Sequence, residues 1–277
     1  MTKDDGLLAA VVAAMDAGAA LLREGRWHSG SKVAKGDRDY ATEVDIRIEE
    51  TIRTALATAA PGIGFLGEEE GERVAESGAL WILDPIDGTV NFANGSPLCG
   101  ISLALVEDGT PTLGVIDLPL LGERYLVRAG SGASLNGRPI HVIEKGGLHE
   151  AIVGFADFAV GPAAKVENRV HRELMDRLVP RCLRVRVHGS EIVDLAWLAA
   201  GRLDVSVMLS SLPWDVTAGV LIAREAGAEV FDQHGSPWSY RSTVTICSTP
   251  GVAPELLPIV QEAVEAADLA AESAPPA

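Results

Sequence analysis

Acidic residues follow apolar, strand-like runs at three separate places, and this arrangement constrains the fold more than any other feature. The runs are IGFL (63–66) before GEEE (67–70), WIL (81–83) before DPIDGT (84–89), and DVSVML (204–209), which is soon followed by WD (214–215). Acids at strand ends converge on the edge of a sheet, where α/β proteins place their sites. The pattern therefore predicts a layered α/β protein with one carboxylate-rich site.

The rest of the chain supplies the elements around that site. Apolar periodicity predicts helices over 5–25 and 43–59, the second opened by the capping-box sequence TEVD (42–45). A meander is expected over 99–130, with hairpin turns at DG (108–109) and NG (136–137). Strands then alternate with helices: strands at 151–156, 183–187, 204–209, 228–232 and 243–248, helices at 166–178, 190–201, 215–227 and 252–270. This alternation is typical of an α/β lobe.

The change of rhythm near EKGGLHE (144–150) predicts a boundary between two lobes. The first, residues 1–146, would carry the DPIDGT motif and the meander. The second, residues 147–277, would carry the WD motif and the residues facing the substrate.

An apolar run near the N-terminus, GLLAAVVAAMDAGAALL (6–22), resembles a signal peptide or a membrane span. The preceding KDD (3–5) is net acidic, and Asp16 interrupts the run. What remains is shorter than the ~20 residues needed to cross a bilayer. We therefore expect an alanine-rich helix packed against the body of the protein, with no membrane partner.

Charge and cysteine content narrow the partners and the compartment. The chain has 39 Asp and Glu against 23 Lys and Arg, a net charge of −16, which argues against nucleic acid as a partner. Cys99, Cys182 and Cys247 are too far apart for a zinc site or a disulfide framework. We expect reduced, mostly buried thiols in the cytoplasm. The P-loop, the serine-hydrolase elbow, the Rossmann glycine pattern and the zincin motif are all missing.

Each acidic residue also has a plain local interpretation. Asp45 could serve only the capping box, Asp215 could only cap a helix, and DGT (87–89) could be only a turn. Together they argue for bound cations, since two carboxylates ~4 Å apart repel by about 4 kcal/mol at an effective dielectric of 20. Oxygen ligands without His or Cys favour Mg²⁺ or Mn²⁺. Backbone N–H groups at Gly88 and Thr89, at a helix start, would suit a phosphate.

These motifs resemble those of a known family. GEE (67–69), WILDPIDGTVNF (81–92) and WDVTAG (214–219) are similar to the signatures of the inositol monophosphatase family, which are magnesium-dependent, lithium-sensitive sugar phosphatases. KGDRDYATEVD (35–45) and HGSEIVDLAWLAAGRLD (188–204) fit as well, so the resemblance spans roughly residues 7–250. It implies an alternating α-β-α-β-α five-layer sandwich, usually dimeric, that hydrolyses a small polyol phosphate such as inositol 1-phosphate.

The resemblance also implies a ligand set for two to three Mg²⁺ ions, with Mn²⁺ as a substitute. Glu68, Asp84 and the Ile86 carbonyl would hold the first ion. Asp84, Asp87 and Asp215 would hold the second, and Glu68 would help to hold a third. Two ions would clamp the phosphoester between the attacking and leaving oxygens.

The catalytic roles follow from the same resemblance. Thr89, hydrogen-bonded to Asp45, would orient and deprotonate the attacking water, with Glu68 nearby as a third catalytic group. Backbone at Gly88 and Thr89 would bind the phosphate. Glu69 is expected just behind the site and Glu70 outside it.

Substrate preference depends on the second half of the chain. Members of the family usually carry an acidic residue seven positions before the WD aspartate, where this chain has Met208. Glu191, directly after Gly189 and Ser190, could compensate by contacting substrate hydroxyls. Alternatively, it could be only an acid in the first turn of a helix, where the helix dipole stabilises a negative charge. We therefore expect a broad phosphatase. Fructose 1,6-bisphosphate, histidinol phosphate and 3′-phosphoadenosine 5′-phosphate remain alternative substrates, and a regulatory protein-binding module with incidental activity remains the alternative of another class.

Overall fold

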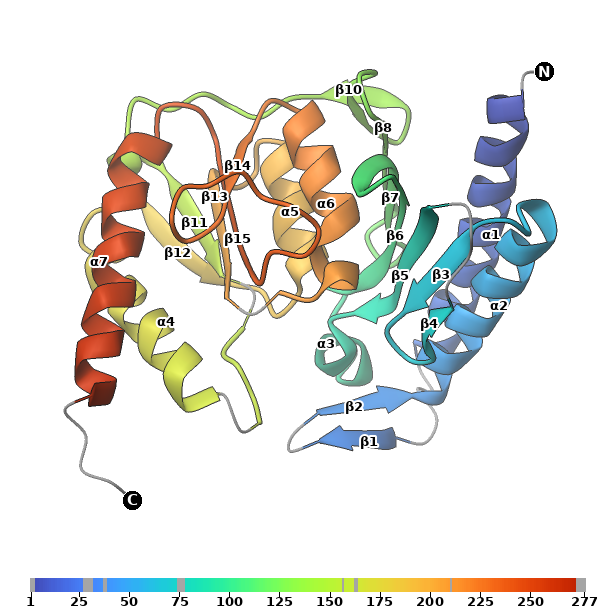
Figure 1. The fold of residues 1–277 in the computed structure, drawn as a ribbon, viewed down its shortest axis with the longest axis horizontal. Helices are drawn as coiled ribbons and strands as arrows, with labels where there is room; N and C mark the ends of the chain where they lie inside the picture. The colour runs from blue at the N-terminus through green and yellow to red at the C-terminus, as the bar shows by residue number, and fades with distance from the viewer. Residues whose placement is uncertain are drawn as a thin grey trace.

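The computed structural model describes residues 3–26, 32–36, 39–73, 78–155, 157–161, 164–209 and 211–272. Helices and sheets alternate in five layers, α-β-α-β-α (Figure 1). The predicted sandwich is therefore confirmed, and its layers determine where the acidic motifs meet.

The first layer consists of α1 (Lys3–Gly25) and α2 (Glu43–Ala59), which pack side by side on the larger sheet (Figure 1). Both helices match their predicted ranges to within two residues at either end. Thr42 caps α2, and the expected capping box with Asp45 is formed. The buried stripe Ile48, Ile52 and Leu56 then faces the sheet.

Helix α1 corrects one sequence argument. It contains a stretch, Gly6–Gly25, of 20 residues that is long and apolar enough to cross a membrane, so the expectation that the run is too short was wrong. Val11, Met15 and Leu22 of this stretch are buried in a core shared with α2 and the larger sheet. Packing on the sheet thus accounts for the apolar side of the helix.

The larger sheet has the strand order β10-β9-β8-β7-β6-β5-β3-β4. Its strands are β3 (Gly64–Gly67), β4 (Gly71–Arg73), β5 (Ala79–Asp87), β6 (Gly100–Glu107), β7 (Thr110–Leu118), β8 (Glu123–Arg128), β9 (Ala133–Leu135) and β10 (Arg138–Ile140). Neighbours are antiparallel except β3 and β5. The predicted meander is confirmed, and Asp108 and Asn136 adopt the positive φ that tight hairpin turns require.

The smaller sheet has the order β12-β11-β13-β15-β14. Its strands are β11 (Ile152–Phe155), β12 (Arg184–Val187), β13 (Val205–Leu209), β14 (Glu229–Phe231) and β15 (Val244–Ser248). Helices α4 (Ala164–Leu178) and α7 (Ala253–Glu272) form the outer layer on one face (Figure 1). The chain passes from the larger sheet to the smaller one between β10 and β11.

The central layer is formed by α5 (Glu191–Ala199) and α6 (Pro213–Glu225), between the two sheets (Figure 1). Ile192 and Ile222 pack toward the larger sheet, whereas Leu195 and Val220 pack toward the smaller one. Apolar residues on both sides of each helix fit a fully covered position. The N-termini of these helices point to the end of β5, and this arrangement builds the site.

Candidate active site

The DPIDGT motif forms the end of β5 and is broken by a β-bulge. Asp84 pairs with Ser102 of β6, whereas Asp87 pairs with Gly100, so the register shifts between the two aspartates. Pro85 has no N–H to donate, which suits a position where the ladder is interrupted. A bulge changes the alternation of side chains along a strand, so residues three apart need not point to opposite faces. Both aspartates are buried here.

The electrostatics show that these carboxylates are crowded. Burial, followed by the charges of Glu68, Asp87 and Asp215, raises the pKa of Asp84 well above its usual range. Burial and the charge of Glu191 raise the pKa of Asp87 in the same way, and that of Asp215. The Oδ1 atoms of Asp84 and Asp87 are buried without a hydrogen-bond partner. Unpaired buried oxygens of this kind are costly unless a cation or proton neutralises them.

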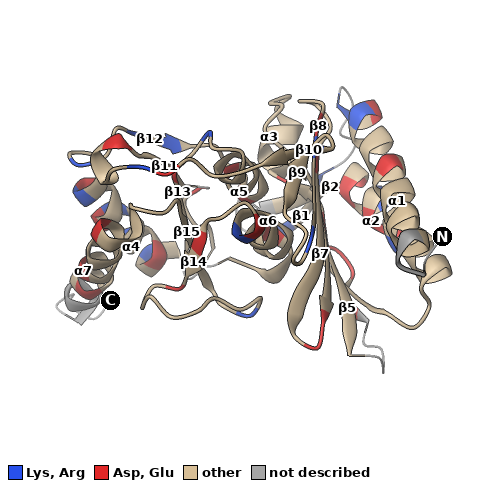
Figure 2. Ribbon diagram, turned by 90° about the horizontal axis from the view of Figure 1, so that it is seen from above, with Lys and Arg blue, Asp and Glu red and all other residues tan. Residues whose placement is uncertain are grey.

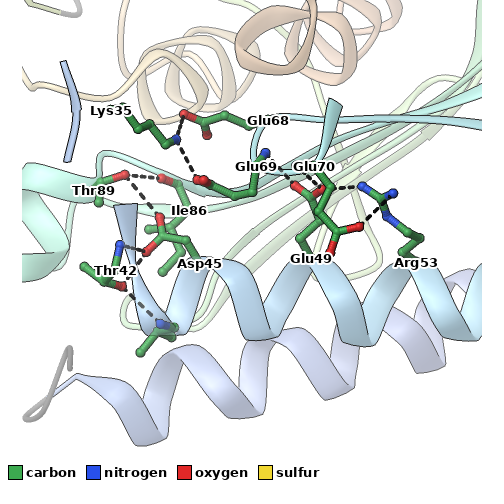
Figure 3. A network of polar contacts seen from close by, with 11 residues as sticks. Lys35, Thr42, Asp45, Glu49, Arg53, Glu68, Glu69, Glu70, Ile86 and Thr89 are labelled. Atoms are coloured by element: carbon green, nitrogen blue, oxygen red, sulfur yellow. Dashed lines mark hydrogen bonds and ion pairs between the residues drawn. The ribbon is translucent and has the colours of Figure 1, made fainter. Parts of the chain in front are cut away.

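Helix α2 brings Asp45 to the same place, and its carboxylate is fully used. Its Oδ2 accepts the backbone N–H of Thr42 at 2.9 Å and also the Thr42 hydroxyl. The hydroxyl of Thr89 lies 3.3 Å from Asp45 Oδ1 and 3.0 Å from the Ile86 carbonyl oxygen (Figure 3). Burial raises the pKa of Asp45. Asp45 therefore serves both the capping box and Thr89.

Glu68 and Glu69 lie in the turn after β3, and both form ion pairs with the side chain of Lys35. Lys35 Nζ lies 2.7 Å from Glu68 Oε1 and 2.6 Å from Glu69 Oε1 (Figure 3). Burial raises the pKa of Glu69 to about 7, although Lys35 opposes this shift. Lys35 comes from a hairpin, β1 (Lys32–Gly36) and β2 (Asp39–Thr42), that the sequence analysis did not predict. Glu70 points away from the site toward Arg53, as expected.

Gly88 joins the bulge to the short helix α3 (Thr89–Ala93). Its φ is +80°, and an added Cβ would lie 2.9 Å from the Leu98 carbonyl oxygen and 3.3 Å from Ser190 Cβ. Only glycine fits both the backbone conformation and the space. Gly88 and Thr89 thus stand where a helix begins, beside the segment 189–190 of the second half of the chain.

The start of α5 completes this side of the site. Ser190 caps the helix, and Asp87 Oδ2 accepts the backbone N–H groups of Glu191 at 3.0 Å and Ile192 at 3.1 Å. Asn91 Nδ2 donates to the carbonyl oxygens of His188 at 2.7 Å and Gly189 at 3.1 Å. The structure therefore brings Gly189, Ser190 and Glu191 together with the DPIDGT motif.

Asp215 reaches the site from α6, but not as the helix cap. Leu212 is the N-cap, and Asp215, three residues later, accepts the Leu212 backbone N–H at 2.8 Å through Oδ2. Helix α6 begins at Pro213, two residues before the predicted start. One carboxylate oxygen of Asp215 is therefore committed to the helix.

Met208 does not lie on the substrate side, and that prediction was wrong. Its side chain is 2% exposed and packs with Leu195 and Val220 between α5, α6 and the smaller sheet. Side chains alternate along β13 between two apolar cores, so position 208 belongs to the interior. Counting seven residues back from Asp215 identifies position 208 in the sequence, but it does not show to which face of β13 the side chain points.

The donor set fits a hard divalent cation in its chemistry. It offers carboxylate and carbonyl oxygens only, two of which are buried and unpartnered. Within the described ranges, no three His, Cys, Asp or Glu side chains surround one point closely enough to hold an ion. Lys35 is paired with Glu68, and Leu212 takes one oxygen of Asp215. A cation bound to Glu68 would therefore lie close to the Lys35 ammonium, which contacts Glu68 Oε1 and would be repelled by the ion.

Two buried acids beside the site escaped the sequence analysis. Glu49, four residues after Asp45 on α2, contacts the turn of Glu68. Asp194 holds His188, with 2.5 Å between Oδ1 and Nδ1. An acidic residue on the otherwise apolar face of a helix was the available signal in both cases.

The five-layer fold and its carboxylate site are those of a phosphoric monoester hydrolase. The model of the inositol monophosphatase family matches residues 3–265, and the chain belongs to that family. The chain is 40% identical over 231 residues to the inositol-1-monophosphatase ImpA of Mycolicibacterium smegmatis, covering 83% of each protein. It is 35% identical over 234 residues to the fructose-1,6-bisphosphatase/inositol-1-monophosphatase of Thermotoga maritima, covering 83% of this chain and 86% of that one. A solved structure of the Thermotoga maritima IMPase superposes with a TM-score of 0.84 at 31% identity, covering 92% of this chain and 97% of that chain.

Proposed function

We propose that this protein is a Mg²⁺-dependent phosphatase of inositol 1-phosphate that also accepts other small polyol phosphates. The observation that carries the proposal is the group of carboxylates Asp84, Asp87 and Asp215, of which the first two are buried and the third is half-buried, each with a raised pKa. Such a group binds an anionic phosphate only when cations reverse the local charge. The relative from Mycolicibacterium smegmatis, whose name gives inositol 1-phosphatase activity, supports the choice of substrate.

The ligands of the ions are proposed as the resemblance implies. Glu68, Asp84 and the Ile86 carbonyl would hold one Mg²⁺; Asp84, Asp87 and Asp215 would hold a second, and Glu68 would help with a third. Bound ions supply positive charge to the phosphate and lower the pKa of a water molecule. Mn²⁺, which also prefers oxygen ligands, would substitute.

The protein's own groups handle the proton. The Thr89 hydroxyl accepts a proton from the attacking water as it passes its own proton to Asp45 Oδ1, 3.3 Å away. Burial raises the pKa of Asp45, which makes it a better proton acceptor than an exposed aspartate. The water attacks phosphorus in line, the ester P–O bond breaks, and the leaving alcohol takes a proton from solvent. Backbone N–H groups at Gly88 and Thr89 hold the phosphate.

Fructose 1,6-bisphosphate is the second candidate substrate, because the relative from Thermotoga maritima is named for both activities. Release of inorganic phosphate should be measured for both compounds, for histidinol phosphate and for 3′-phosphoadenosine 5′-phosphate, with Mg²⁺ and with EDTA. We expect Mg²⁺-dependent release that is fastest from inositol 1-phosphate. No release from any of the four with Mg²⁺ would contradict the phosphatase and favour a binding module.

We also propose that the protein is a homodimer. Strand β12 lies at the edge of the smaller sheet, and Val179, Leu183 and Val187 beside or within it are about half exposed. Arg184 and Arg186 alternate along this strand, and Figure 2 shows blue, basic positions on it in this acidic chain. Apolar side chains on an open edge suit a protein interface. Light scattering that gives the mass of one chain would contradict the dimer.

A further inference from the structure

A fully buried glutamate on α2 holds the turn that carries Glu68. Glu49 Oε2 accepts the backbone N–H of Glu69 at 2.9 Å, and Oε1 accepts that of Glu70 at 3.0 Å (Figure 3). Arg53, one turn further along α2, donates to the same carboxylate through Nη2 at 2.5 Å. Within the part of the chain that the structure describes, Glu49 thus pairs with this turn and with the arginine beside it.

The position of the carboxylate is closely constrained. A Cβ added at Gly67 would lie 2.3 Å from Glu49 Oε1, so the side chain occupies space that only glycine leaves open. Arg53 is fixed in turn, with its guanidinium 4.7 Å from the centre of the Phe65 ring and 3.0 Å from Glu70 Oε2. A buried carboxylate costs several kcal/mol unless it is paired, and here two amides and a guanidinium pair it.

The same helix also sets the other half of the site. Asp45 and Glu49 are one helical turn apart and face the same side of α2. Asp45 holds Thr89, and Glu49 holds the turn from which Glu68 and Glu69 reach Lys35 (Figure 3). Any movement of this turn moves the Glu68 carboxylate with respect to Asp84.

We propose that Glu49 is a positioning residue for the cation site: its carboxylate fixes the 68–70 turn so that Glu68 stands opposite Asp84 and Thr89. The inference rests on the proposed function in one respect, since it takes Glu68 to be an ion ligand. Glu49 itself contacts neither ion nor substrate. Its effect should therefore appear in ion affinity and in the protection of the turn amides.

The test compares Glu49→Gln with Glu50→Gln, which makes the same change one residue later on the exposed side of α2. Calorimetric titration of the metal-free protein with Mg²⁺ and Mn²⁺ should show at least tenfold weaker binding for Glu49→Gln and no change for Glu50→Gln. Hydrogen exchange at the amides of Glu69 and Glu70 should be faster in Glu49→Gln alone. Wild-type ion affinity in Glu49→Gln would overturn the proposal, even if the amides exchange faster.

Gly67→Ala provides a second route if Glu49→Gln does not fold. The added methyl pushes the carboxylate aside without changing any charge, and it should also weaken ion binding at least tenfold. Adding Gly67→Ala to Glu49→Ala should lower the melting temperature much less than Gly67→Ala does in the wild type, because the clash is gone. Unchanged ion affinity in Gly67→Ala would overturn the proposal.

The two proposals fail in different ways. If the wild type binds Mg²⁺ but releases no phosphate from any substrate, the proposed function fails and the role of Glu49 stands. If the wild type is an active phosphatase and Glu49→Gln binds Mg²⁺ equally well, the role of Glu49 fails and the function stands.

Discussion

Asp87 accepts the backbone N–H of Glu191 at 3.0 Å, and this contact joins the two halves of the chain inside the site. Asp87 ends β5 of the larger sheet, and Glu191 is the first residue of α5 in the central layer. The helix N-terminus favours the ionised form of Asp87, but burial and the Glu191 carboxylate outweigh it and raise the pKa of Asp87. The site therefore has an excess of negative charge where the two halves meet, which bound cations would neutralise.

Asp84→Asn tests the dependence on ions. Asp84 would be shared by both ions, so the change removes charge from both sites, and kcat/KM with Mg²⁺ should fall at least a thousandfold, about 4 kcal/mol. The fold should survive, because removing one of several crowded carboxylates relieves repulsion in the metal-free protein. Phosphate release and the melting temperature in EDTA measure the two effects. Wild-type activity at saturating Mg²⁺ would contradict the assignment.

Thr89 and Asp45 should act as a unit. A threonine hydroxyl is a weak base by itself and depends on the Asp45 carboxylate to take its proton. We expect Thr89→Ala and Asp45→Asn each to lower kcat about 10²–10⁴-fold, and the double variant to be little worse than the more damaging single one. Steady-state kinetics of the three variants measure this. Losses that simply multiply would show that the residues act independently.

Lithium should inhibit the enzyme, as in the family that it resembles. Li⁺ would occupy the second site, formed by Asp84, Asp87 and Asp215, and hold the product phosphate there. Phosphate release should fall with LiCl but not with KCl at the same ionic strength, which separates site binding from screening. Identical curves for the two salts would mean that this site differs from that of the family.

The sequence predicts the helix and sheet layers because turn residues and apolar periodicity, which are local features, agree with the elements that the fold contains. The DG and NG turns fix the meander, and the apolar stripes of α1 and α2 match their burial. Three of the missed strands, β1, β2 and β4, are short, and β1 is exposed along its length, so no apolar alternation marks them. Strands β1 and β2 form a separate two-stranded sheet, and β4 is the edge strand next to β3, so none of them needs the apolar alternation of a strand in a core.

The sequence predicts that the acidic motifs meet, as the mutual charge effects of Glu68, Asp84, Asp87 and Asp215 show, but it does not predict the geometry of their meeting. The bulge between Asp84 and Asp87 depends on pairing with β6, which a linear motif does not encode. Met208 failed for a related reason, since the direction of a side chain on β13 depends on register within the sheet. An acid on the apolar face of α2 indicates that Glu49 is buried and paired, but it does not show that two of its partners are backbone amides about twenty residues away.

Glu191 should contribute to substrate choice. Its charge acts on both Asp87 and Asp215, so it lies beside the proposed ion site rather than only on the helix surface. Glu191→Ala should reduce the preference for inositol 1-phosphate over glycerol 2-phosphate about tenfold, the value of one hydrogen bond to a charged group. Met208→Leu, a buried change of similar volume, is the matched control and should leave this ratio unchanged. An unaltered ratio in Glu191→Ala would remove Glu191 from substrate recognition.

His171 should make the folded state sensitive to acid. Its ring is buried and stacked between Phe155 and Phe158, with centroids 4.6 and 4.0 Å away, and its Nε2 has no hydrogen-bond partner. Burial lowers the pKa of His171 to about 4, from about 6.5 in an unfolded chain. Between these values the unfolded state binds more protons, so the contribution of this residue to stability is complete above pH ~6.5 and is lost as the pH falls toward about 4.

The variant His171→Phe keeps an aromatic ring in the stack and removes the titration. Urea unfolding at pH 7.5 and pH 4.5 gives the free energy of unfolding of both proteins. The carboxyl groups of the protein titrate in both, so the difference between the two proteins isolates the effect of His171. Over this range we expect the wild type to lose on the order of 2 kcal/mol more than His171→Phe, below the full linkage value because solvent screens part of the effect. Parallel losses would show that His171 takes up its proton without unfolding, through a rearrangement that hydrates the ring.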